Sequence, residues 1–272
     1  LRLGGPVSDL GSTHDVEGFE TLLVERDAAV AIVTINRPDK RNALNAAVRR
    51  ELLAALDVLR DDDAVRVVVI TGAGGNFSGG ADFAAFASGE VDAAMSFSEA
   101  PHDVLTRIET YAKPVIAAIN GPAMGLGLEL AVSCDIRIMN KTAIVRLPEL
   151  TLGLVPGAGG TQRIGRLIGW ARAKEMILLT DPVSADKALE WSLVNMVAEP
   201  KEFKATVDKV AAKLASGAPL AQKYAKGLLY YGAQADQRTA LYLEGAISGE
   251  IGMTKDLNEG ITAVSYTHLR AH

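Results

Sequence analysis

The residues of this chain that are best suited to chemistry lie where a glycine-rich turn leads into a helix. The apolar run at residues 114–119 predicts a buried strand, and the dipeptide Asn120-Gly121 that follows it is typical of a turn. Residues 128–134 predict a helix, because they are helix formers without Gly or Pro. A helix start leaves backbone N–H groups unpaired and carries a positive partial charge, so it favours an oxyanion. This turn is therefore a candidate site for stabilising negative charge.

Two glutamates are placed to supply acid and base groups beside that turn. Glu129 lies one helical turn after Leu126, on the same side of the predicted helix. Glu149 follows the next predicted strand, residues 135–139, and such a helix–strand–turn path can return the chain beside its start. A carboxylate beside an oxyanion-binding amide is suited to proton transfer. The alternative, that both glutamates are first-turn acids that complement helix dipoles, stays open at this point.

The remaining pattern indicates a layered α/β protein. Strand–strand–helix units recur before about residue 200, and helices alone are predicted from 219 to 264. A second glycine-rich loop, residues 72–82, follows a buried strand. The predicted strands are residues 20–26, 29–36, 66–71, 114–119, 135–139 and 193–197, and further helices are predicted at residues 45–60, 171–179, 184–191 and 201–215. Residues 83–112 are expected to be irregularly helical.

Composition narrows the possible partners and compartments. The formal net charge of −5 and the lack of any long basic run argue against a nucleic-acid surface. Every long apolar stretch is interrupted well before the ~20 residues that a membrane helix needs. The single cysteine, Cys134, fits a reducing compartment. We therefore expect a cytoplasmic protein with no membrane segment and no nucleic-acid partner.

Cofactor and metal motifs do not fit the sequence. The loop at residues 72–82 begins like a dinucleotide fingerprint, but Phe77 occupies the place of the third glycine. No phosphate-binding P-loop and no nucleophile elbow occur, and Ser78 is explained as a turn residue. The four histidines and Cys134 lack metal-ligand spacing. We expect no metal, and the remaining combination points to a carbonyl compound whose anion is held by backbone amides.

Several motifs, in order along the chain, resemble the crotonase (enoyl-CoA hydratase/isomerase) superfamily. The resemblance runs from Glu20 to Val264, nearly the whole chain. The motifs are Asn36-Arg-Pro with Asn42-Ala-Leu44, Phe77-Ser-Gly-Gly-Ala-Asp82, Ala118-Ile-Asn-Gly-Pro-Ala-Met-Gly125, Pro148-Glu149 and Pro156-Gly-Ala-Gly-Gly-Thr-Gln-Arg163. Together they identify the chain as a member of that superfamily, closest to the enoyl-CoA hydratases.

The resemblance implies the crotonase (ClpP-like) fold, an α/β spiral of repeated β-β-α units with a helical C-terminal portion. The spiral core is expected at residues 18–200, and C-terminal helices that support trimers are expected at residues 201–264. A flexible leader at residues 1–17 and a non-native tail at residues 265–272, which resembles translated adapter sequence, are expected to flank them. Because family members form trimers, often paired into hexamers, a homotrimer or a dimer of trimers is expected.

The resemblance also implies an enzyme that adds water across the 2,3 double bond of an enoyl-CoA thioester. Its oxyanion hole would be the backbone N–H groups of Ala81 and Leu126, which grip the thioester oxygen. Glu129 and Glu149 would hold one water between them. Glu129 would help to remove its proton as oxygen adds to the β-carbon, and Glu149 would deliver a proton to the α-carbon.

Substrate-binding residues are implied in the same way. The CoA moiety would lie along Lys40, Arg41, Ala43, Leu44, Gly79, Ala81 and Asp82. The acyl pocket would be shaped by Phe83, Phe86, Met95 and Leu126. No separate cofactor is implied, because coenzyme A is part of the substrate.

One departure from the family pattern concerns the substrate. Hydratases usually have glycine at the position of Leu126, and a branched side chain there is expected to narrow or redirect the acyl pocket. Three alternatives stay open: a Δ3–Δ2 enoyl-CoA isomerase, which needs only a proton shuttle such as Glu149; a crotonase-type hydratase or hydrolase of cyclic acyl-CoAs; and a non-catalytic homologue that binds RNA or serves as a scaffold. The negative net charge and the two glutamates argue against the last.

Overall fold

Two sheets of unequal size frame the protein in the computed structural model, which describes residues 18–83, 102–254, 257 and 261–262. The larger sheet has six strands in the order β1-β2-β3-β4-β6-β9, and the smaller has three in the order β5-β7-β8. In the large sheet β1 is antiparallel to β2, and every other neighbouring pair is parallel. The strands are β1 (Leu22–Asp27), β2 (Val30–Ile35), β3 (Val67–Gly72), β4 (Val115–Ile119), β5 (Ala123–Met124), β6 (Ile136–Asn140), β7 (Ile144–Arg146), β8 (Val183–Ser184) and β9 (Met196–Ala198).

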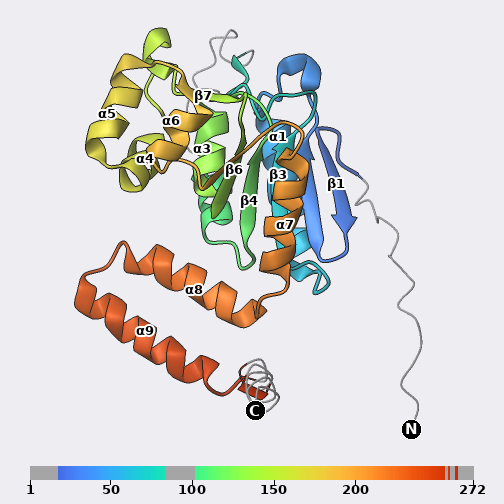
Figure 1. Cartoon of the computed structure of the whole chain (residues 1–272), viewed down its shortest axis with the longest axis vertical. Coiled ribbons are helices and arrows are strands. Elements are labelled where there is room, and N and C mark those ends of the chain that lie inside the picture. Colours follow the sequence, from blue (N-terminus) through green and yellow to red (C-terminus); the bar gives the residue numbers. More distant parts are fainter. Residues whose placement is uncertain (1–17, 84–101, 255–256, 258–260, 263–272) are drawn as a thin grey trace.

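Helices follow the strands and cover the large sheet (Figure 1). The α-helices are α1 (Ala46–Asp61), α3 (Leu126–Ser133), α4 (Gly160–Ile168), α5 (Trp170–Leu179), α6 (Ala185–Glu190), α7 (Phe203–Ala215), α8 (Pro219–Gly232) and α9 (Gln237–Ile251), with a further helix at residues 102–109. Two short 3₁₀ helices are η1 (Pro38–Lys40) and η3 (Glu149–Leu152). The expected leader at residues 1–17 and the expected tail at residues 265–272 lie outside the described residues.

The large sheet is buried on both faces, which explains why its central strands are almost wholly apolar. Successive side chains of β3 point to opposite faces. Val68 and Ile70 join the larger core cluster, to which α1 and α3 contribute, whereas Val67 and Val69 join a smaller cluster with α7. The hydrophobic effect therefore fixes the sheet between helices on both sides.

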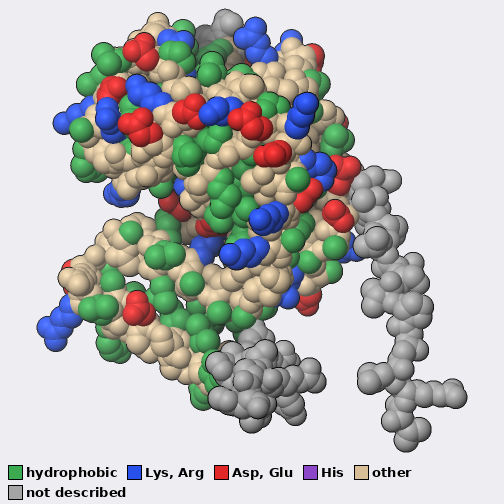
Figure 2. Space-filling model, viewed as in Figure 1, with side chains coloured by type: hydrophobic (Ala, Val, Ile, Leu, Met, Phe, Trp, Pro, Cys, Tyr) green, Lys and Arg blue, Asp and Glu red, His purple; other side chains and the backbone are tan. Residues whose placement is uncertain are grey.

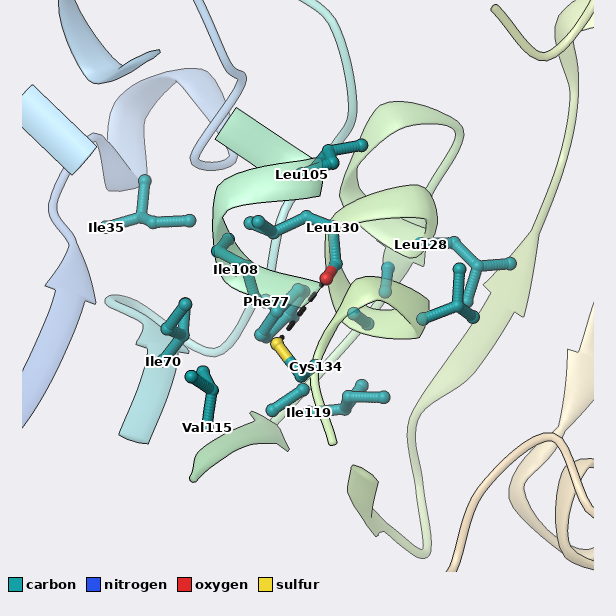
Figure 3. Close-up of a cluster of buried hydrophobic side chains, with 14 of the residues drawn as sticks. Ile35, Ile70, Phe77, Leu105, Ile108, Val115, Ile119, Leu128, Leu130 and Cys134 are labelled. Atoms are coloured by element: carbon teal, nitrogen blue, oxygen red, sulfur yellow. Dashed lines mark hydrogen bonds between the residues drawn. The ribbon is translucent and has the colours of Figure 1, made fainter. Parts of the chain in front are cut away.

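Cys134 belongs to the larger cluster, as its apolar surroundings in the sequence predict. Figure 3 shows its thiol beside the fully buried Phe77 and directed toward the Leu130 carbonyl, to which it donates over 3.5 Å. Burial raises the pKa of the Cys134 thiol to about 12. Cys134 is therefore an inert packing residue.

The predicted strand–strand–helix units recur as β1-β2-α1, β4-β5-α3 and, with η3 inserted, β6-β7-α4. In the last two units the first strand belongs to the large sheet and the second to the small sheet, so the chain changes sheet before each helix. The segment after β3 makes a similar crossing through isolated bridges of Ser78 with Ala123 and of Leu44 with Ala81. Helix starts and glycine-rich loops consequently meet along the small sheet.

Two predictions about strands need correction. The strand predicted at residues 193–197 begins only at Met196, because the N–H groups of Leu193 and Val194 both donate to the Ala188 carbonyl and close the end of α6. The strands of the small sheet were not predicted. They are two or three residues long, which is too short to display an alternating pattern.

Helices α8 and α9 form an arm that projects from the rest of the molecule (Figure 1). They pack on each other, and neither contains a buried residue. Figure 2 shows the hollow beside the arm, where a cavity of about 730 Å³ lies between α8 and the body. Lys226 of α8 crosses to the body, where its ammonium contacts the Asp135 carboxylate at 2.7 Å and the Ile108 carbonyl at 3.0 Å. None of the described helices is both long and apolar enough to span a bilayer.

Candidate active site

Glu129 lies in the first turn of α3, a helix whose residues are all buried. Its side chain is 2% exposed, and Oε1 accepts hydrogen bonds from the N–H groups of Ala158 at 2.9 Å and Gly160 at 2.8 Å. No other described residue donates to this carboxylate. Burial raises the pKa of Glu129, and the two N–H groups oppose that rise because they stabilise the charged form.

Glycine at position 160 is needed for this contact. A Cβ atom there would lie 2.8 Å from Oε1 and 3.0 Å from Cγ of Glu129, closer than side-chain atoms tolerate. Because Gly160 has no side chain, the backbone at the N-terminal end of α4 can approach the Glu129 carboxylate closely. The loop at residues 156–160 is therefore shaped around Glu129.

Glu149 is the first residue of η3, and it is also buried, with 9% of its surface exposed. Its Oε2 atom is enclosed and has no hydrogen-bond partner among the described residues. Burial raises the pKa of Glu149 to about 7, and the negative charge of Glu129 adds to that rise. A Cβ atom on Gly125 would lie 2.7 Å from Oε1 of Glu149, so the start of α3 lies directly beside this carboxyl group. The structure thus brings the two glutamates together at one end of α3.

Two backbone N–H groups lie unpaired near the glutamates. Neither Ala81 nor Leu126 donates its N–H to any described residue. Gly80, with a positive φ of 96°, lies so close to the start of α3 that a Cβ atom on it would be 2.7 Å from the Met124 carbonyl oxygen and 3.6 Å from the Leu126 nitrogen. The segment with Ala81 therefore adjoins the helix start with Leu126.

The residues that the resemblance assigns to CoA form two adjacent segments. The Gly79 N–H donates to the Arg41 carbonyl at 2.7 Å, and Leu44 both accepts from Asp82 at 3.1 Å and donates to the Gly80 carbonyl at 2.7 Å. Residues 41–44 and 79–82 thus run side by side, which brings all seven candidates into two adjoining segments, with Leu44 buried and the others at least partly exposed: Lys40, Arg41, Ala43, Leu44, Gly79, Ala81 and Asp82. Lys40 and Arg41 are exposed there.

A buried amide that sequence reasoning did not single out lies beside these segments. Asn42 is fully buried in a left-handed conformation, and its Nδ2 donates to the carbonyls of Ala73 and Asn76, both at 2.8 Å. Its Oδ1 accepts from the Arg37 N–H at 2.9 Å, and its carbonyl accepts from the Ser78 hydroxyl at 2.9 Å. The motif Asn42-Ala-Leu44 was visible in the sequence, but a buried role for its amide depends on loops that lie 31 to 36 residues away.

The candidates for the acyl pocket are only partly described. Phe83 is 42% exposed, and Leu126 is 5% exposed within the larger core cluster. Phe86 and Met95 lie outside the described residues. The large cavity beside α8 is a different place, since neither glutamate and neither unpaired amide lines it. Its lining includes Glu109, Arg163 and Lys226.

Taken together, the site has two buried carboxyl groups whose pKa values are raised, and two unpaired N–H groups beside them. Such an arrangement is suited to moving protons next to a carbonyl oxygen that becomes negative. The carboxyl groups can hold different protonation states, because like charges push their pKa values apart. The geometry favours acid–base chemistry on an activated carbonyl compound.

Comparison with known proteins agrees with this chemistry. A family model described as enoyl-CoA hydratase/isomerase matches residues 25–267. The chain is 41% identical over 246 residues to the short-chain-enoyl-CoA hydratase of Clostridium acetobutylicum, covering 90% of this chain and 94% of that protein. It is 39% identical to the crotonyl-CoA hydratase of Syntrophomonas wolfei, covering 90% and 95%.

Solved structures show the same fold. The crystal structure of an enoyl-CoA hydratase from Bacillus anthracis matches with a TM-score of 0.88 and 36% identity, covering 91% of this chain and 97% of that one. The crotonase fold predicted from the motifs is thereby confirmed. With the family model and the relatives in agreement over nine-tenths of its length, the chain belongs to the enoyl-CoA hydratase/isomerase family.

Proposed function

We propose that the protein is a hydratase that adds water across the 2,3 double bond of a short-chain enoyl-CoA thioester. The observation that carries the proposal is the pair of buried glutamates beside two unpaired backbone N–H groups. The names of the relatives from Clostridium acetobutylicum and Syntrophomonas wolfei support the choice of a short-chain substrate. Leu126 stands where hydratases usually have glycine, and we propose that its branched side chain narrows the acyl pocket.

The N–H groups of Ala81 and Leu126 are proposed to bind the thioester oxygen. As water adds to the β-carbon, electrons of the double bond move toward the carbonyl, and the oxygen becomes an enolate. Amide dipoles that are fixed before the reaction stabilise this charge without reorganising. Leu126 donates from the first turn of α3, where the helix dipole adds to the stabilisation.

Glu129 and Glu149 are proposed as base and acid. Glu129 accepts a proton from the water whose oxygen bonds to the β-carbon, and Glu149 donates its proton to the α-carbon. Two backbone hydrogen bonds favour the charged form of Glu129, whereas the enclosed Oε2 of Glu149 has no donor and favours the protonated form. A proton then passes from Glu129 to Glu149, directly or through solvent, before the next turnover.

Binding of CoA is proposed along residues 40–44 and 79–82. Lys40 and Arg41 are exposed cations at one end of this surface, and they have the charge to meet phosphate groups. The other end of the surface leads to Ala81 and hence to the proposed oxyanion hole. One continuous strip therefore connects a phosphate-binding end to the reacting end.

An isomerase is the second candidate, because a Δ3–Δ2 shift needs one proton shuttle. Glu149, with a pKa raised to about 7, is suited to that task alone. The two functions differ in their need for Glu129. Hydration requires a base for water, so Glu129→Gln should suppress hydration more strongly than isomerisation.

The test is the loss of the conjugated enoyl-thioester absorbance when the protein is mixed with crotonyl-CoA and water. We expect decay with the unmodified protein and a reduction of about 10³-fold in Glu149→Gln, in line with the loss of general acid catalysis. Glu190→Gln, at an exposed glutamate at the end of α6, is the control and should react normally. Near-normal hydration in Glu149→Gln would remove Glu149 from the mechanism. No decay with the unmodified protein, although the thioester binds, would favour the isomerase.

We also propose that the protein assembles as a trimer through its C-terminal arm. Helix α7 packs on the large sheet, so the proposed contact is confined to α8 and α9. These helices contain no buried residue and expose large apolar side chains, including Leu229 at 76% and Tyr242 at 76%. Apolar surface of this kind is typical of an interface between subunits.

A further inference from the structure

Arg163 lies in the first half of α4 and folds back over the loop that contacts Glu129. Its Nη1 atom donates to the Ala158 carbonyl at 2.8 Å. The guanidinium lies over Gly159, where a Cβ atom would stand 2.1 Å from Nη1. Ala158 is therefore held at both of its polar groups, because its carbonyl accepts from Arg163 while its N–H donates to Glu129. A displacement of the Arg163 side chain would therefore move Ala158 and, with it, a hydrogen-bond donor to Glu129.

The other edge of the guanidinium is paired with Glu109. Arg163 Nε and Nη2 lie 3.0 Å and 2.9 Å from Glu109 Oε2, and the Arg163 side chain is only 12% exposed. Glu109 is the last residue of the helix at residues 102–109. Arg163 thus connects three parts of the chain: this helix, the loop at residues 156–160 and α4.

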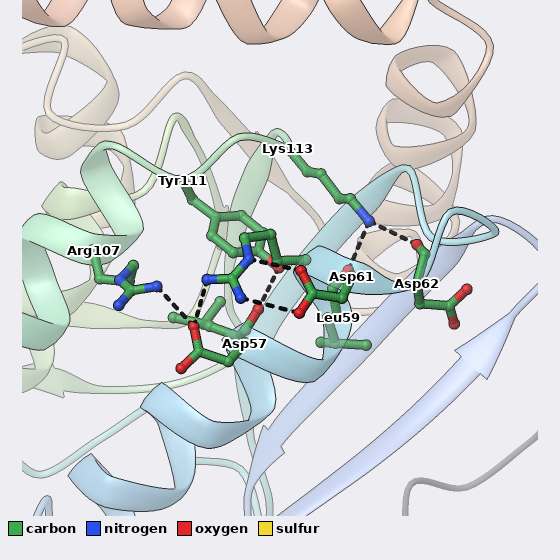
Figure 4. Close-up of polar contacts among 9 residues, drawn as sticks. Asp57, Leu59, Asp61, Asp62, Arg107, Tyr111 and Lys113 are labelled. Atoms are coloured by element: carbon green, nitrogen blue, oxygen red, sulfur yellow. Dashed lines mark hydrogen bonds and ion pairs between the residues drawn. The ribbon is translucent and has the colours of Figure 1, made fainter.

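The helix that carries Glu109 is itself fixed to α1. Figure 4 shows Arg107 paired with Asp57 and the segment that follows the helix bound to the end of α1. The Arg107 Nη1 and Asp57 Oδ1 atoms are 2.7 Å apart. The Tyr111 hydroxyl donates to the Leu56 carbonyl at 2.7 Å, and the Lys113 ammonium donates to the carbonyls of Leu59 and Asp62. Glu109 consequently offers Arg163 a partner that is anchored to the body of the protein.

Charge also links Arg163 to Glu129. Burial raises the pKa of Glu129, and this rise is opposed first by the N–H groups of Gly160 and Ala158 and then by the charge of Arg163, with a smaller electrostatic effect from His102. Among the described residues Glu149 is also coupled to Glu129, because its pKa is raised by burial and further by the charge of Glu129. Loss of the Arg163 charge should therefore raise the pKa of Glu129 and leave less of it ionised at a given pH.

We propose that Arg163 is a positioning residue for the base: it holds the loop at residues 156–160 against Glu129 and supplies a facing positive charge, with Glu109 as its anchor. The inference rests on the proposed role of Glu129 in hydration. It assigns two separable tasks to one side chain, orientation through hydrogen bonds and electrostatic stabilisation of the carboxylate. Conservative substitutions can separate these tasks, because lysine keeps the charge but lacks the planar fork of donors.

The experiment compares Arg163→Gln, Arg163→Lys and Glu109→Gln in hydration of crotonyl-CoA, with Arg166→Gln as the matched control. Arg166 is exposed on the same helix and bonds only within it, to the backbone and side chain of Gln162. We expect kcat to fall about tenfold in both Arg163 variants because the base is misplaced, with KM changed less than about twofold. Arg166→Gln should match the unmodified protein.

The pH profile separates the proposal from a merely structural role. In Arg163→Gln the acidic limb of kcat/KM should move to higher pH, since Glu129 must be ionised to act as base. In Arg163→Lys and Glu109→Gln a cation remains at position 163. The acidic limb of kcat/KM should therefore not move to higher pH in these two variants. A limb that stays in place in Arg163→Gln, or moves equally in Arg166→Gln, would overturn the proposal. If Arg163→Gln does not fold, kcat of Arg163→Lys decides, and a value equal to that of the unmodified protein would overturn the proposal.

A second readout does not depend on turnover. The Glu129 carboxyl carbon, identified by its disappearance in Glu129→Gln, can be titrated by ¹³C NMR in protein labelled at glutamate. Its midpoint should be higher in Arg163→Gln than in the unmodified protein, and unchanged in Arg166→Gln. If the unmodified protein fails to hydrate crotonyl-CoA, the proposed function fails, and this titration still decides whether Arg163 acts on Glu129. Equal midpoints in all three proteins would overturn the proposal.

Discussion

Glu149 differs from an ordinary surface glutamate because burial of its carboxyl group is only partly compensated, by a backbone hydrogen bond at Glu149 itself. Its Oε2 is enclosed without a donor, and the charge of Glu129 is nearby. Both features favour the protonated acid, which explains why its pKa is raised to about 7 while Glu129 has two N–H donors. At the scale of single residues, the two carboxyl groups are thus distinguished by what surrounds them.

This difference predicts the alkaline limb of the hydration reaction. Because the proposed acid must be protonated to deliver its proton, kcat/KM for crotonyl-CoA should be highest about one pH unit or more below 7 and approach a tenfold fall per pH unit above 7. The measurement is the initial rate between pH 6 and pH 9 in buffers of constant ionic strength. A profile that stays flat up to pH 9 would show that Glu149 does not act as the acid in this range.

The pH dependence of the free energy of unfolding, measured in urea, tests the raised pKa of Glu149 independently of catalysis. The pKa of Glu149 is higher in the folded than in the unfolded protein, so the folded state binds the proton more tightly. The resulting stabilisation is complete below the unfolded pKa, near 4.5, and is lost as the pH rises through about 7. In Glu149→Gln this loss should be absent, so the variant should gain on the order of 1 kcal/mol relative to the unmodified protein between pH 5 and pH 8.

Sequence reasoning found both glutamates, but not what tunes them. The glycine-rich helix start and the position of Glu129 one turn beyond Leu126 were enough to suggest an acid beside an oxyanion site. The donors to Glu129, however, are backbone groups 29 and 31 residues further along the chain. Residue type does not show which N–H groups are left free for a distant carboxylate, so this part of the site required the fold.

At the scale of elements, Asn42 replaces secondary structure where none is available. The loops around Asn42 make few β-sheet backbone hydrogen bonds. Its amide pairs with two backbone carbonyls and one backbone N–H, which would otherwise be buried without hydrogen-bond partners. The Asn42 side chain thereby fixes residue 42 against the loop at residues 73–76, while backbone hydrogen bonds pair residues 41–44 with residues 79–82. This register determines where the proposed CoA surface meets Ala81.

Asn42→Ala should therefore weaken substrate binding as well as stability. Loss of the buried hydrogen bonds should lower the free energy of unfolding by about 2–3 kcal/mol, because three backbone groups lose their partner. KM for crotonyl-CoA should rise more than kcat falls, because Glu129 and Glu149 lie on other elements. Urea denaturation and steady-state kinetics measure the two effects.

Asn140→Ala is the matched control for this prediction. Its side chain accepts hydrogen bonds from Thr142 in an exposed turn after β6, away from the proposed CoA surface. The Asn140→Ala variant should have a lower free energy of unfolding and an unchanged KM for crotonyl-CoA. An unchanged KM in Asn42→Ala as well would show that the two segments keep their register without the amide.

Element length decided which parts of the fold were predictable. Long elements with a clear period, such as α1, β3 and β4, were predicted within one or two residues of their observed ends, whereas the three-residue β9 was not. The small sheet was missed because strands of two or three residues carry no period, although its position follows from pairing with distant segments. One of these short strands, β5, leads directly into the start of α3 with Leu126 and Glu129.

At the scale of the whole molecule, the body and the arm are built differently. The body buries apolar side chains on both faces of the large sheet, whereas α8 and α9 expose theirs. Lys226 joins α8 to the body by polar contacts with Asp135 and backbone carbonyls. The arm thus has a defined attachment and a large uncovered apolar surface, which a second copy of the chain would cover in the proposed trimer.

Charged substitutions on the arm should therefore break the assembly and spare the fold. We expect the unmodified protein to have the mass of three 28.7 kDa chains, or of a multiple of three, in sedimentation equilibrium. Leu229→Glu combined with Tyr242→Glu should shift the protein toward the single-chain mass, because both side chains are 76% exposed in one chain and their replacement puts unpaired charges into an apolar contact. Val58→Glu, at a 49% exposed position on α1, is the control and should keep the trimer mass. A double variant that keeps the trimer mass, with an unchanged circular dichroism spectrum, would place the subunit contact elsewhere.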